Sequence, residues 1–520
     1  MALARLHTYN EPLDMDGSTY AVIARELLSG KDLYTDLWDH KPPAIYATYV
    51  AGQLIAGCGP AHVYLLGLSV AFLTMLGIYL AAARAAGAGA GLCAAAFWAI
   101  ISADLLLQAN QPNTEAFINA SLIWALALLM QTPADGLGLR RLLSLGALLA
   151  LASLYKHVAL VTGAAMLAAH IVATGLRRRS VIEALSVTAV IAAIWGAVIG
   201  YFAATGRYTA FVDTVIGFNQ TYSGSLWTNL QDGLRADRLT PEYMLQFWPL
   251  LVPIAALTLG RSGPLGLRTL ILFLAFVLAT IVSIALPGRF FAHYYQLWLP
   301  ILCVLAACGI AVLRNAVGRP RLFPAFAAVI ASLLGLLQVQ NFARPPEEWA
   351  RVKFGPQLLL SSRAAEIINQ LLTADEQFFQ WGHQPELYYY TGRRPVGGEF
   401  RSRLLLHGPR QEERTARLLR ELQTHRPELI VRVTDHDFPP NHPAPMWIME
   451  NYSALQTPLC DPQLAKLFLF LVRRDGRLQA DVPAEPCLGA TALPLHGRGW
   501  YTSRDVLAER AQPAHHLRHG

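Results

Sequence analysis

Residues 14–43 read DMDGSTYAVIARELLSGKDLYTDLWDHKPP and stand directly ahead of a long apolar region. This stretch is the densest cluster of charged residues next to that region. Two acids, Asp14 and Asp16, open it, and Lys41 followed by two prolines closes it. Acids and a base gathered beside apolar sequence indicate a functional site rather than a linker. The sequence downstream decides which face of a membrane the stretch occupies.

The composition is that of a polytopic membrane protein. Only 15% of the 520 residues are charged and 54% are hydrophobic, whereas a soluble protein has about 25% charged residues. Residues 44–340 hold only 24 charged side chains. Long apolar stretches of this kind predict membrane helices. We expect about ten spans, at 62–81, 88–107, 115–131, 142–160, 161–176, 182–203, 243–260, 269–287, 294–313 and 322–340.

Two short features break this pattern. Residues 44–57 are apolar but too short to span, so we expect an interfacial or re-entrant helix beside the membrane. Lys156 and His157 interrupt one long apolar run, which predicts a tight turn on the outer side.

Arginines fix the orientation. They cluster in every second connection: Arg84, Arg140 and Arg141, Arg177 to Arg179, Arg261 and Arg268, and Arg314, Arg319 and Arg321. The positive-inside rule places these connections in the cytoplasm. Topology therefore explains the net charge of +7 better than a nucleic-acid partner does. We therefore expect residues 1–43 and 341–520 on the opposite side of the inner (plasma) membrane, in the periplasm.

The opening stretch needs a route across the membrane. Residues 1–13 are too short and polar to span, and they contain no signal-peptide core. We expect either a further helix upstream of this chain or passage of the stretch together with the first span.

The tail differs from the rest of the chain. Short strand-like runs, helical patterns and Gly/Pro punctuation from residue 341 onward predict a small α/β extracytoplasmic domain. The expected organisation is a first outer loop at 1–61, a membrane domain at 62–340 and the tail domain at 341–520. In an oxidising compartment, Cys460 and Cys487 could form a disulfide. No Cys-x-x-Cys or Cys/His metal spacing occurs.

Each candidate residue has a structural alternative. Asp14 or Asp16 can act as a general base, or can cap the helix that starts near Gly17. Lys41 can bind phosphate, or can extend to lipid headgroups. Pro42 and Pro43 hold His40 and Lys41 in an extended segment.

The other candidates lie farther along the chain. Glu115 can be functional or can simply suit a helix N-terminus. Lys156 interrupts an apolar run, and ionisable residues at membrane depth are functional candidates. Arg289 and His293 lie in PGRFFAHYYQLWLP, whose aromatic residues also fit a membrane-interface belt. Loop alternation alone assigns all these candidates to one membrane face, where they could bind a phosphorylated lipid headgroup and a polar acceptor.

Several segments resemble a known family. DMDGSTYAVIARELLSGKDLYTDLWDHKPPAIY resembles the first outer loop of GT-C glycosyltransferases of the protein-mannosyltransferase and aminoarabinose-transferase group (glycosyltransferase family 39-like). QPNTEAF, GRFFAHYYQLWLP and WGHQPELYYYTGRRP resemble later segments of bacterial members. Family members also have a membrane helix ahead of the first loop.

The resemblance implies an inverting transfer of a sugar from a polyprenyl-phosphate donor at the outer face of the membrane. Asp16 matches the family's catalytic base, and the altered pair of Asp14 and Asp16 leaves open whether a divalent cation binds. Lys41, with Arg289 as a helper, would stabilise the leaving lipid phosphate, and Glu115 would position a substrate. A flippase of lipid-linked sugars and a non-catalytic polysaccharide-assembly protein are the alternatives. The sequence identifies neither the sugar nor the acceptor, which can be a lipid, a glycan or a protein.

Overall fold

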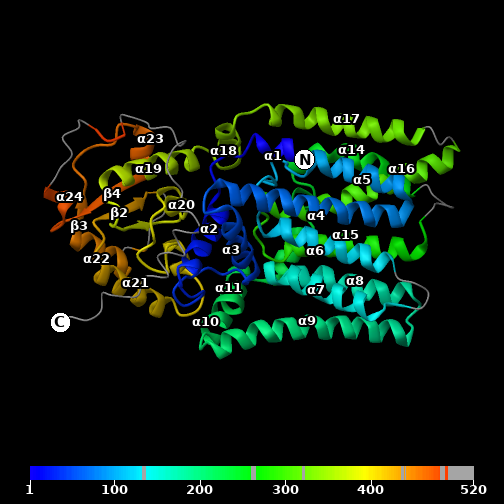
Figure 1. The fold of residues 1–520 in the computed structure, drawn as a ribbon, viewed down its shortest axis with the longest axis horizontal. Helices are drawn as coiled ribbons and strands as arrows, with labels where there is room; N and C mark the ends of the chain where they lie inside the picture. The colour runs from blue at the N-terminus through cyan, green and yellow to red at the C-terminus, as the bar shows by residue number, and fades with distance from the viewer. Residues whose placement is uncertain are drawn as a thin grey trace.

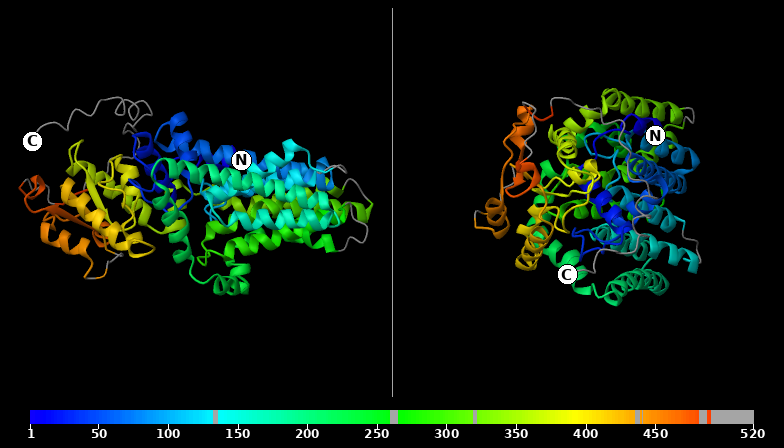
Figure 2. Two further views of the ribbon diagram at one scale, coloured as in Figure 1. Left: turned by 90° about the horizontal axis from the view of Figure 1, so that it is seen from below. Right: turned by 60° about the vertical axis from the view of Figure 1, so that its left-hand side comes forward.

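The computed structural model describes residues 1–131, 136–258, 265–318, 322–434, 439, 441–480 and 487–489. Figure 1 shows a bundle of long helices at one end and a smaller sheet-containing domain at the other. Helices α2 and α3 lie between the two parts, and the views in Figure 2 keep this order. The predicted helical membrane protein with a small α/β tail domain is confirmed.

Three helices precede the bundle. They are α1 (Ala2–Leu6), α2 (Met15–Leu28) and α3 (Ala44–Ala56). Asp14 caps α2, and Pro43 caps α3 with a φ of −72°, close to the angle that the proline ring imposes. Gly57 ends α3 with a φ of 76°, which glycine adopts at little cost. Short helices beside the membrane were expected in this loop and are present.

A helix overlaps each of the ten ranges predicted as spans. These helices are α4 (Pro60–Ala86), α5 (Ala88–Ile101), α6 (Thr114–Met130), α7 (Leu139–Tyr155), α8 (Ala159–Ala173), α9 (Arg178–Ala204), α14 (Trp248–Ala255), α15 (Leu267–Ala285), α16 (Leu299–Val317) and α17 (Leu322–Phe342). Five stretches within the described residues are long and apolar enough to cross a membrane: Pro60–Ala86, Arg178–Ala204, Leu267–Ala285, Ala292–Val317 and Phe323–Phe342. The chain is a multi-pass membrane protein.

Burial orders the helices within the bundle. The stretch Ala292–Val317, which contains α16, has 89% of its apolar window buried, whereas the windows of α9 and α17 are 17% buried. Helix α16 is therefore central. Figure 1 shows α9 and α17 along opposite edges of the bundle, which agrees with the low burial of both helices.

Three of the predicted cytoplasmic arginines contact one end of α6. Arg84 and Arg268 donate hydrogen bonds to backbone carbonyls of Ala127 and Leu129, and Arg141 donates to the carbonyl of Gln131. Glu115 lies at the opposite end of this 17-residue helix, about 25 Å away at 1.5 Å per residue. The basic end and the predicted site therefore lie at opposite ends of the bundle. Arg261, Arg319 and Arg321 lie outside the described residues.

Two connections on the site's side carry short helices. The longer one contains α10 (Tyr208–Val212), the π-helix η1 (Asp213–Phe218), α11 (Asn219–Ser223), α12 (Leu226–Gly233), α13 (Ala236–Leu239) and the 3-10 helix η2 (Glu242–Phe247). The 3-10 helix η3 (Ala256–Thr258) extends α14, and the 3-10 helix η4 (Ala292–Trp298) leads into α16. The predicted turn at Lys156 is present between α7 and α8.

The tail domain contains one four-stranded sheet, in the order β1-β2-β4-β3. Strands β1 (Phe378–Trp381) and β2 (Leu429–Val433) pair in parallel, and β4 (Phe468–Arg473) and β3 (Tyr452–Ala454) follow antiparallel. The helices are α18 (Pro346–Phe354), α19 (Gln357–Leu371), α20 (Glu386–Thr391), the 3-10 helix η5 (Ser402–Leu406), α21 (Gln411–His425), α22 (Pro443–Asn451), α23 (Pro462–Leu467) and α24 (Arg477–Ala480). Apolar residues on β2 and β4 fill the core of this domain.

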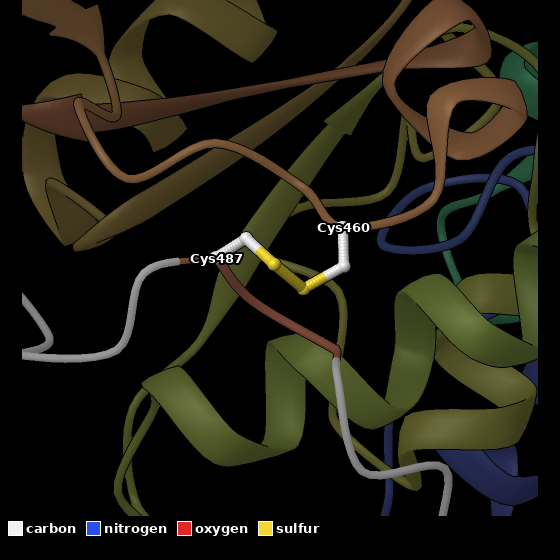
Figure 3. The surroundings of a disulfide bond; sticks show 2 residues. All are labelled: Cys460 and Cys487. Carbon is white, nitrogen blue, oxygen red and sulfur yellow. A yellow bond between two sulfur atoms is a disulfide. The ribbon is translucent and has the colours of Figure 1, made fainter.

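A disulfide joins Cys460 to Cys487 beside this sheet, as Figure 3 shows. Backbone hydrogen bonds pair the same two segments, because Cys460 donates to Leu488 and Leu488 donates to Pro458. The pairing that the sequence suggested is present.

Candidate functional site

The two acids of the opening stretch have different surroundings. Asp14 Oδ1 accepts the Gly17 N–H at 2.6 Å, so Asp14 caps α2. The sequence allowed either Asp14 or Asp16 to cap this helix. The structure has Asp14 at the N-cap and Asp16 in the first turn. Burial, followed by the nearby charge of Asp16, raises the pKa of Asp14 to about 6. Asp16 lies in the first turn of α2 and faces a polar cluster instead.

Cations surround Asp16. Arg401 Nη2 lies 3.7 Å from Asp16 Oδ1, and Lys41 and His293 are close enough to interact electrostatically. Burial opposes ionisation of this carboxyl, but the charges of Lys41 and Arg401 outweigh it and lower the pKa of Asp16 to about 2. Asp16 is therefore an anion at neutral pH.

Asp39 is a second acid in the cluster, and it was not among the predicted site residues. Its Oδ1 lies 3.0 Å from Arg401 Nη1 and 3.2 Å from His40 Nδ1, and its Oδ2 accepts the Tyr46 hydroxyl at 2.7 Å. Burial opposes ionisation, yet Arg401 and His40 hold the pKa of Asp39 well below its usual range. This carboxylate is fully buried and its oxygens are occupied, so it organises the site.

Lys41 is held at the centre of the cluster by the extended Lys-Pro-Pro segment. Its carbonyl accepts the Tyr34 hydroxyl at 2.8 Å, and the residue is 8% exposed. Burial disfavours its charge, but Asp16 raises the pKa of Lys41 above its ordinary value. Within the part of the chain that the structure describes, its ammonium makes no hydrogen bond and has no carboxylate within ion-pair distance. A buried ammonium with free donors is suited to binding an anion.

Glu115 and Lys156 form a second ion pair in the cluster. Asn113 caps α6 by accepting the Thr114 N–H, which places Glu115 in the first helical turn. Lys156 Nζ, from the turn between α7 and α8, lies 2.8 Å from Glu115 Oε1 and 3.4 Å from the centre of the Tyr294 ring. The turn between α7 and α8 thus brings the Lys156 ammonium to the Glu115 carboxylate on α6.

Histidines and Arg289 complete the set of predicted residues. His293, on η4, interacts electrostatically with Glu115 and Asp16. His40 borders the cluster through Asp39. Arg289 is exposed and donates to the carbonyl of Tyr222, whose ring lies against His40. The structure therefore brings Asp16, Lys41, Glu115, Lys156 and His293 together, whereas Asp14 caps a helix and Arg289 lies outside the cluster.

Arg401 was not among the predicted site residues. This side chain comes from the tail domain, is 5% exposed, and also lies 3.1 Å from His383 Nε2. Its segment carries no motif, and only the tertiary fold brings it to Asp39.

A divalent cation does not fit the acidic pair. Asp14 is occupied in capping α2, and Asp16 faces two cations. Among the residues described, no three His, Cys, Asp or Glu side chains are placed to hold a metal ion.

The cluster can stabilise charge that moves during a reaction. Asp16 supplies a carboxylate that can accept a proton, and Lys41 supplies an ammonium that can hold a leaving anion. The ion pair of Glu115 and Lys156 belongs to the same cluster.

Solved structures show the same fold. ArnT from Cupriavidus metallidurans, bound to undecaprenyl phosphate, aligns over 90% of this chain and 95% of its own, with a TM-score of 0.60 and 16% identity. The apo state of ArnT gives the same values. The archaeal oligosaccharyltransferase AglB from Archaeoglobus fulgidus aligns over 83% of this chain and 68% of its own, with a lower TM-score of 0.46 and 11% identity. No protein-family model and no curated protein matches the sequence. The chain therefore has the GT-C fold that its first outer loop and later segments predicted.

Proposed function

We propose that the protein is an inverting glycosyltransferase that moves a sugar from a polyprenyl-phosphate donor to a lipid, glycan or protein acceptor. The observation that carries the proposal is the buried Lys41 ammonium, unpaired among the described residues, beside the ionised Asp16. The fold is that of ArnT, which was solved with undecaprenyl phosphate bound. A lipid-linked phosphate would supply the anion that Lys41 lacks.

In the proposed reaction, an acceptor hydroxyl or amine attacks the anomeric carbon from the side opposite the phosphate. The new bond to the acceptor forms while the bond between the anomeric carbon and the phosphate oxygen breaks, through an oxocarbenium-like state. The released electron pair stays on the lipid phosphate, which Lys41 stabilises. The acceptor proton passes to Asp16, and attack from the opposite side inverts the anomeric configuration.

The low pKa of Asp16 fits this sequence of events. A carboxylate with a pKa of about 2 is a weak base because the cations nearby stabilise its charge. A phosphate bound at Lys41 would neutralise part of that positive field and raise the pKa of Asp16. Donor binding would thus prepare the base, while Glu115 and Lys156 position a substrate.

The site would lie on the periplasmic face of the inner membrane, together with the tail domain. This placement is supported by the separation between the arginine-rich end of α6 and the cluster at its other end. A flippase is less favoured, because its charges would lie near the bilayer midplane. A non-catalytic role in polysaccharide assembly would not explain why the Lys41 ammonium is buried without a partner among the described residues.

Supplying purified protein with polyprenyl-phosphate sugars and measuring the released lipid phosphate tests the proposal. We expect turnover with a productive donor and acceptor, and its loss in Asp16→Asn while donor binding persists. Full activity of Asp16→Asn would remove Asp16 from the role. Transport of an intact donor without release of the phosphate would identify a flippase.

A further inference from the structure

A cavity lies beside the candidate site, between the first outer loop, η1 and α21. Its volume is about 110 Å³, a few times the roughly 30 Å³ that one water molecule occupies in the liquid. Trp38 and Phe218 form part of its buried wall, and exposed Arg410, Glu413 and Arg420 form part of its rim. We call it the α21 pocket.

Arginine dominates the α21 pocket. Arg410 precedes α21, and Arg414, Arg417 and Arg420 follow on one face of the helix at helical spacing, so four arginines line the cavity. Among the described residues, Asp213 and Glu413 are the carboxylates that line it, and Arg410 pairs with both, at 2.8 and 3.4 Å. The lining therefore carries two more positive than negative charges, before the buried Glu399 behind it is counted.

Part of this charge is used for structure. Glu399, buried behind α21, accepts from Arg414 at 2.8 and 2.9 Å and from Arg417 at 2.6 Å. Arg414 also stacks 3.6 Å from the centre of the Trp38 ring. These contacts hold α21 against the first outer loop. They also occupy the Arg414 guanidinium, so it is not available to a ligand.

Other donors remain available. Arg417 Nε is buried without a hydrogen-bond partner. Arg420 is exposed, and among the described residues it forms neither a hydrogen bond nor an ion pair. Guanidinium groups with free donors at a cavity select phosphate or carboxylate groups.

The α21 pocket and the candidate site share a wall. Trp38 directly precedes Asp39, and Phe218 lies 4.9 Å from the Trp38 ring and 5.2 Å from the His40 ring. A substrate that reaches Asp16 from the tail side could therefore place another of its groups in the pocket. The tail domain and the outer loop supply most of its lining, not the apolar bundle helices.

We propose that the α21 pocket binds a phosphate or carboxylate group of an anionic saccharide acceptor. This inference rests on the proposed function, because only a transferase needs an acceptor. The inference narrows the class of acceptor to sugars whose negatively charged group is separate from the group that reacts.

Binding of glucose 1-phosphate to the full-length protein in detergent tests the inference, with glucose as the uncharged control. We expect glucose to bind at least about tenfold more weakly, as a charge-assisted contact requires. Arg420→Gln breaks no ion pair and should raise the Kd for glucose 1-phosphate about threefold, the size of an exposed charge interaction. Adding Arg410→Gln, which also breaks the ion pairs of Arg410 with Asp213 and Glu413, should bring the loss to about tenfold.

The matched control is Arg426→Gln, which removes an exposed arginine that follows the same helix and pairs with Asp475. Its Kd should stay within about twofold of the wild-type value. Equal binding of glucose and glucose 1-phosphate, or an unchanged Kd in the double variant, would overturn the inference.

Two further arms separate the α21 pocket from the donor site and from a lipid site. Undecaprenyl phosphate should bind the double variant normally and bind Lys41→Ala poorly. If Lys41→Ala, and not the double variant, loses glucose 1-phosphate, the anion binds at the donor site and the pocket assignment is wrong while the proposed function stands. Displacement of glucose 1-phosphate by short-chain phosphatidylglycerol would make the pocket a lipid-headgroup site and also overturn the inference.

Discussion

Arg401 Nη1 lies 3.0 Å from Asp39 Oδ1, although the two residues are 362 positions apart in the chain. Both side chains are almost completely buried. The same guanidinium reaches Asp16. The tail domain is therefore not an appendage, because it supplies one of the cations that set the charge of the site.

Replacing Arg401 should destabilise the protein. Arg401→Gln leaves the Asp39 carboxylate buried without its main cation, which costs about 3–5 kcal/mol in comparable buried pairs. The midpoint of thermal unfolding of the purified protein measures the loss. The control is Arg363→Gln, whose ion pair with Asp461 is exposed and should contribute less than about 1 kcal/mol.

A second substitution separates the charge effect from lost packing. Asp39→Asn in the Arg401→Gln background removes the uncompensated charge and should recover part of the stability. If Arg401→Gln unfolds at the same temperature as Arg363→Gln, the pair does not stabilise the fold.

Asp16→Asn and Asp14→Asn should differ sharply. Asparagine caps helices about as well as aspartate, so Asp14→Asn keeps the bond to Gly17 and should retain most of the turnover. Asp16→Asn removes the proposed base and should lower kcat by about 10²- to 10⁴-fold. Lipid-phosphate release at saturating donor compares the two variants. Equal losses in both would show that the acids act as a pair.

Lys41→Ala should weaken donor binding. Loss of a charge-assisted hydrogen bond costs about 1.5–3 kcal/mol, which corresponds to a Kd about 10 to 100 times higher for undecaprenyl phosphate. Lys31→Ala provides the control, because Lys31 is exposed in the same outer loop. An unchanged Kd in Lys41→Ala would place the lipid phosphate elsewhere.

The sequence predicted those parts of the site that lie close together along the chain or follow from topology. Asp16 and Lys41 belong to one short stretch, and loop alternation assigned Glu115, Lys156 and His293 to the same face. The structure brings these five residues into one cluster. Hydropathy likewise located α4 to α9 and α14 to α17, because a bilayer imposes a strong and simple pattern.

Arg401 and the role of Asp39 could not be predicted in this way. Arg401 is one of many arginines in a polar tail, and no local pattern distinguishes it from its neighbours. Asp39 lies within the opening stretch, but its role depends on a partner that only folding brings near. Arg289 was grouped with the site because it shares the membrane face, yet its side chain turns to Tyr222. Topology assigns a face but does not decide which way a side chain points.

Stability should fall as pH rises through 7 because of Glu386. Burial raises the pKa of this carboxyl from 4.5 to about 7, so the folded state favours the protonated form. That contribution is fully present below pH 4.5, the unfolded value, and is lost as pH rises through the folded value. Its upper limit is about 3 kcal/mol.

Glu386→Gln should flatten this dependence. Glutamine stays neutral and can still accept the Ser361 hydroxyl hydrogen bond. Thermal unfolding at pH 5 and pH 8 should show a smaller decrease for this variant than for the wild type or for exposed Glu412→Gln. Identical decreases in all three proteins would show that Glu386 ionises freely in the folded state.

The Cys460–Cys487 disulfide makes the compartment of the tail domain testable. Its cysteines are 27 residues apart, and closing a loop of this length stabilises a fold by about 3–4 kcal/mol. Because disulfides persist only in oxidising compartments, protein in native membranes should resist thiol alkylation at both positions until it is reduced. The paired substitution of both cysteines by serine should lower the unfolding midpoint, whereas Cys93→Ser leaves the bond intact. Free thiols at Cys460 and Cys487 in freshly prepared membranes would place the tail on the reducing side. In that case the cluster around Asp16, which Arg401 ties to the tail, would face the cytoplasm.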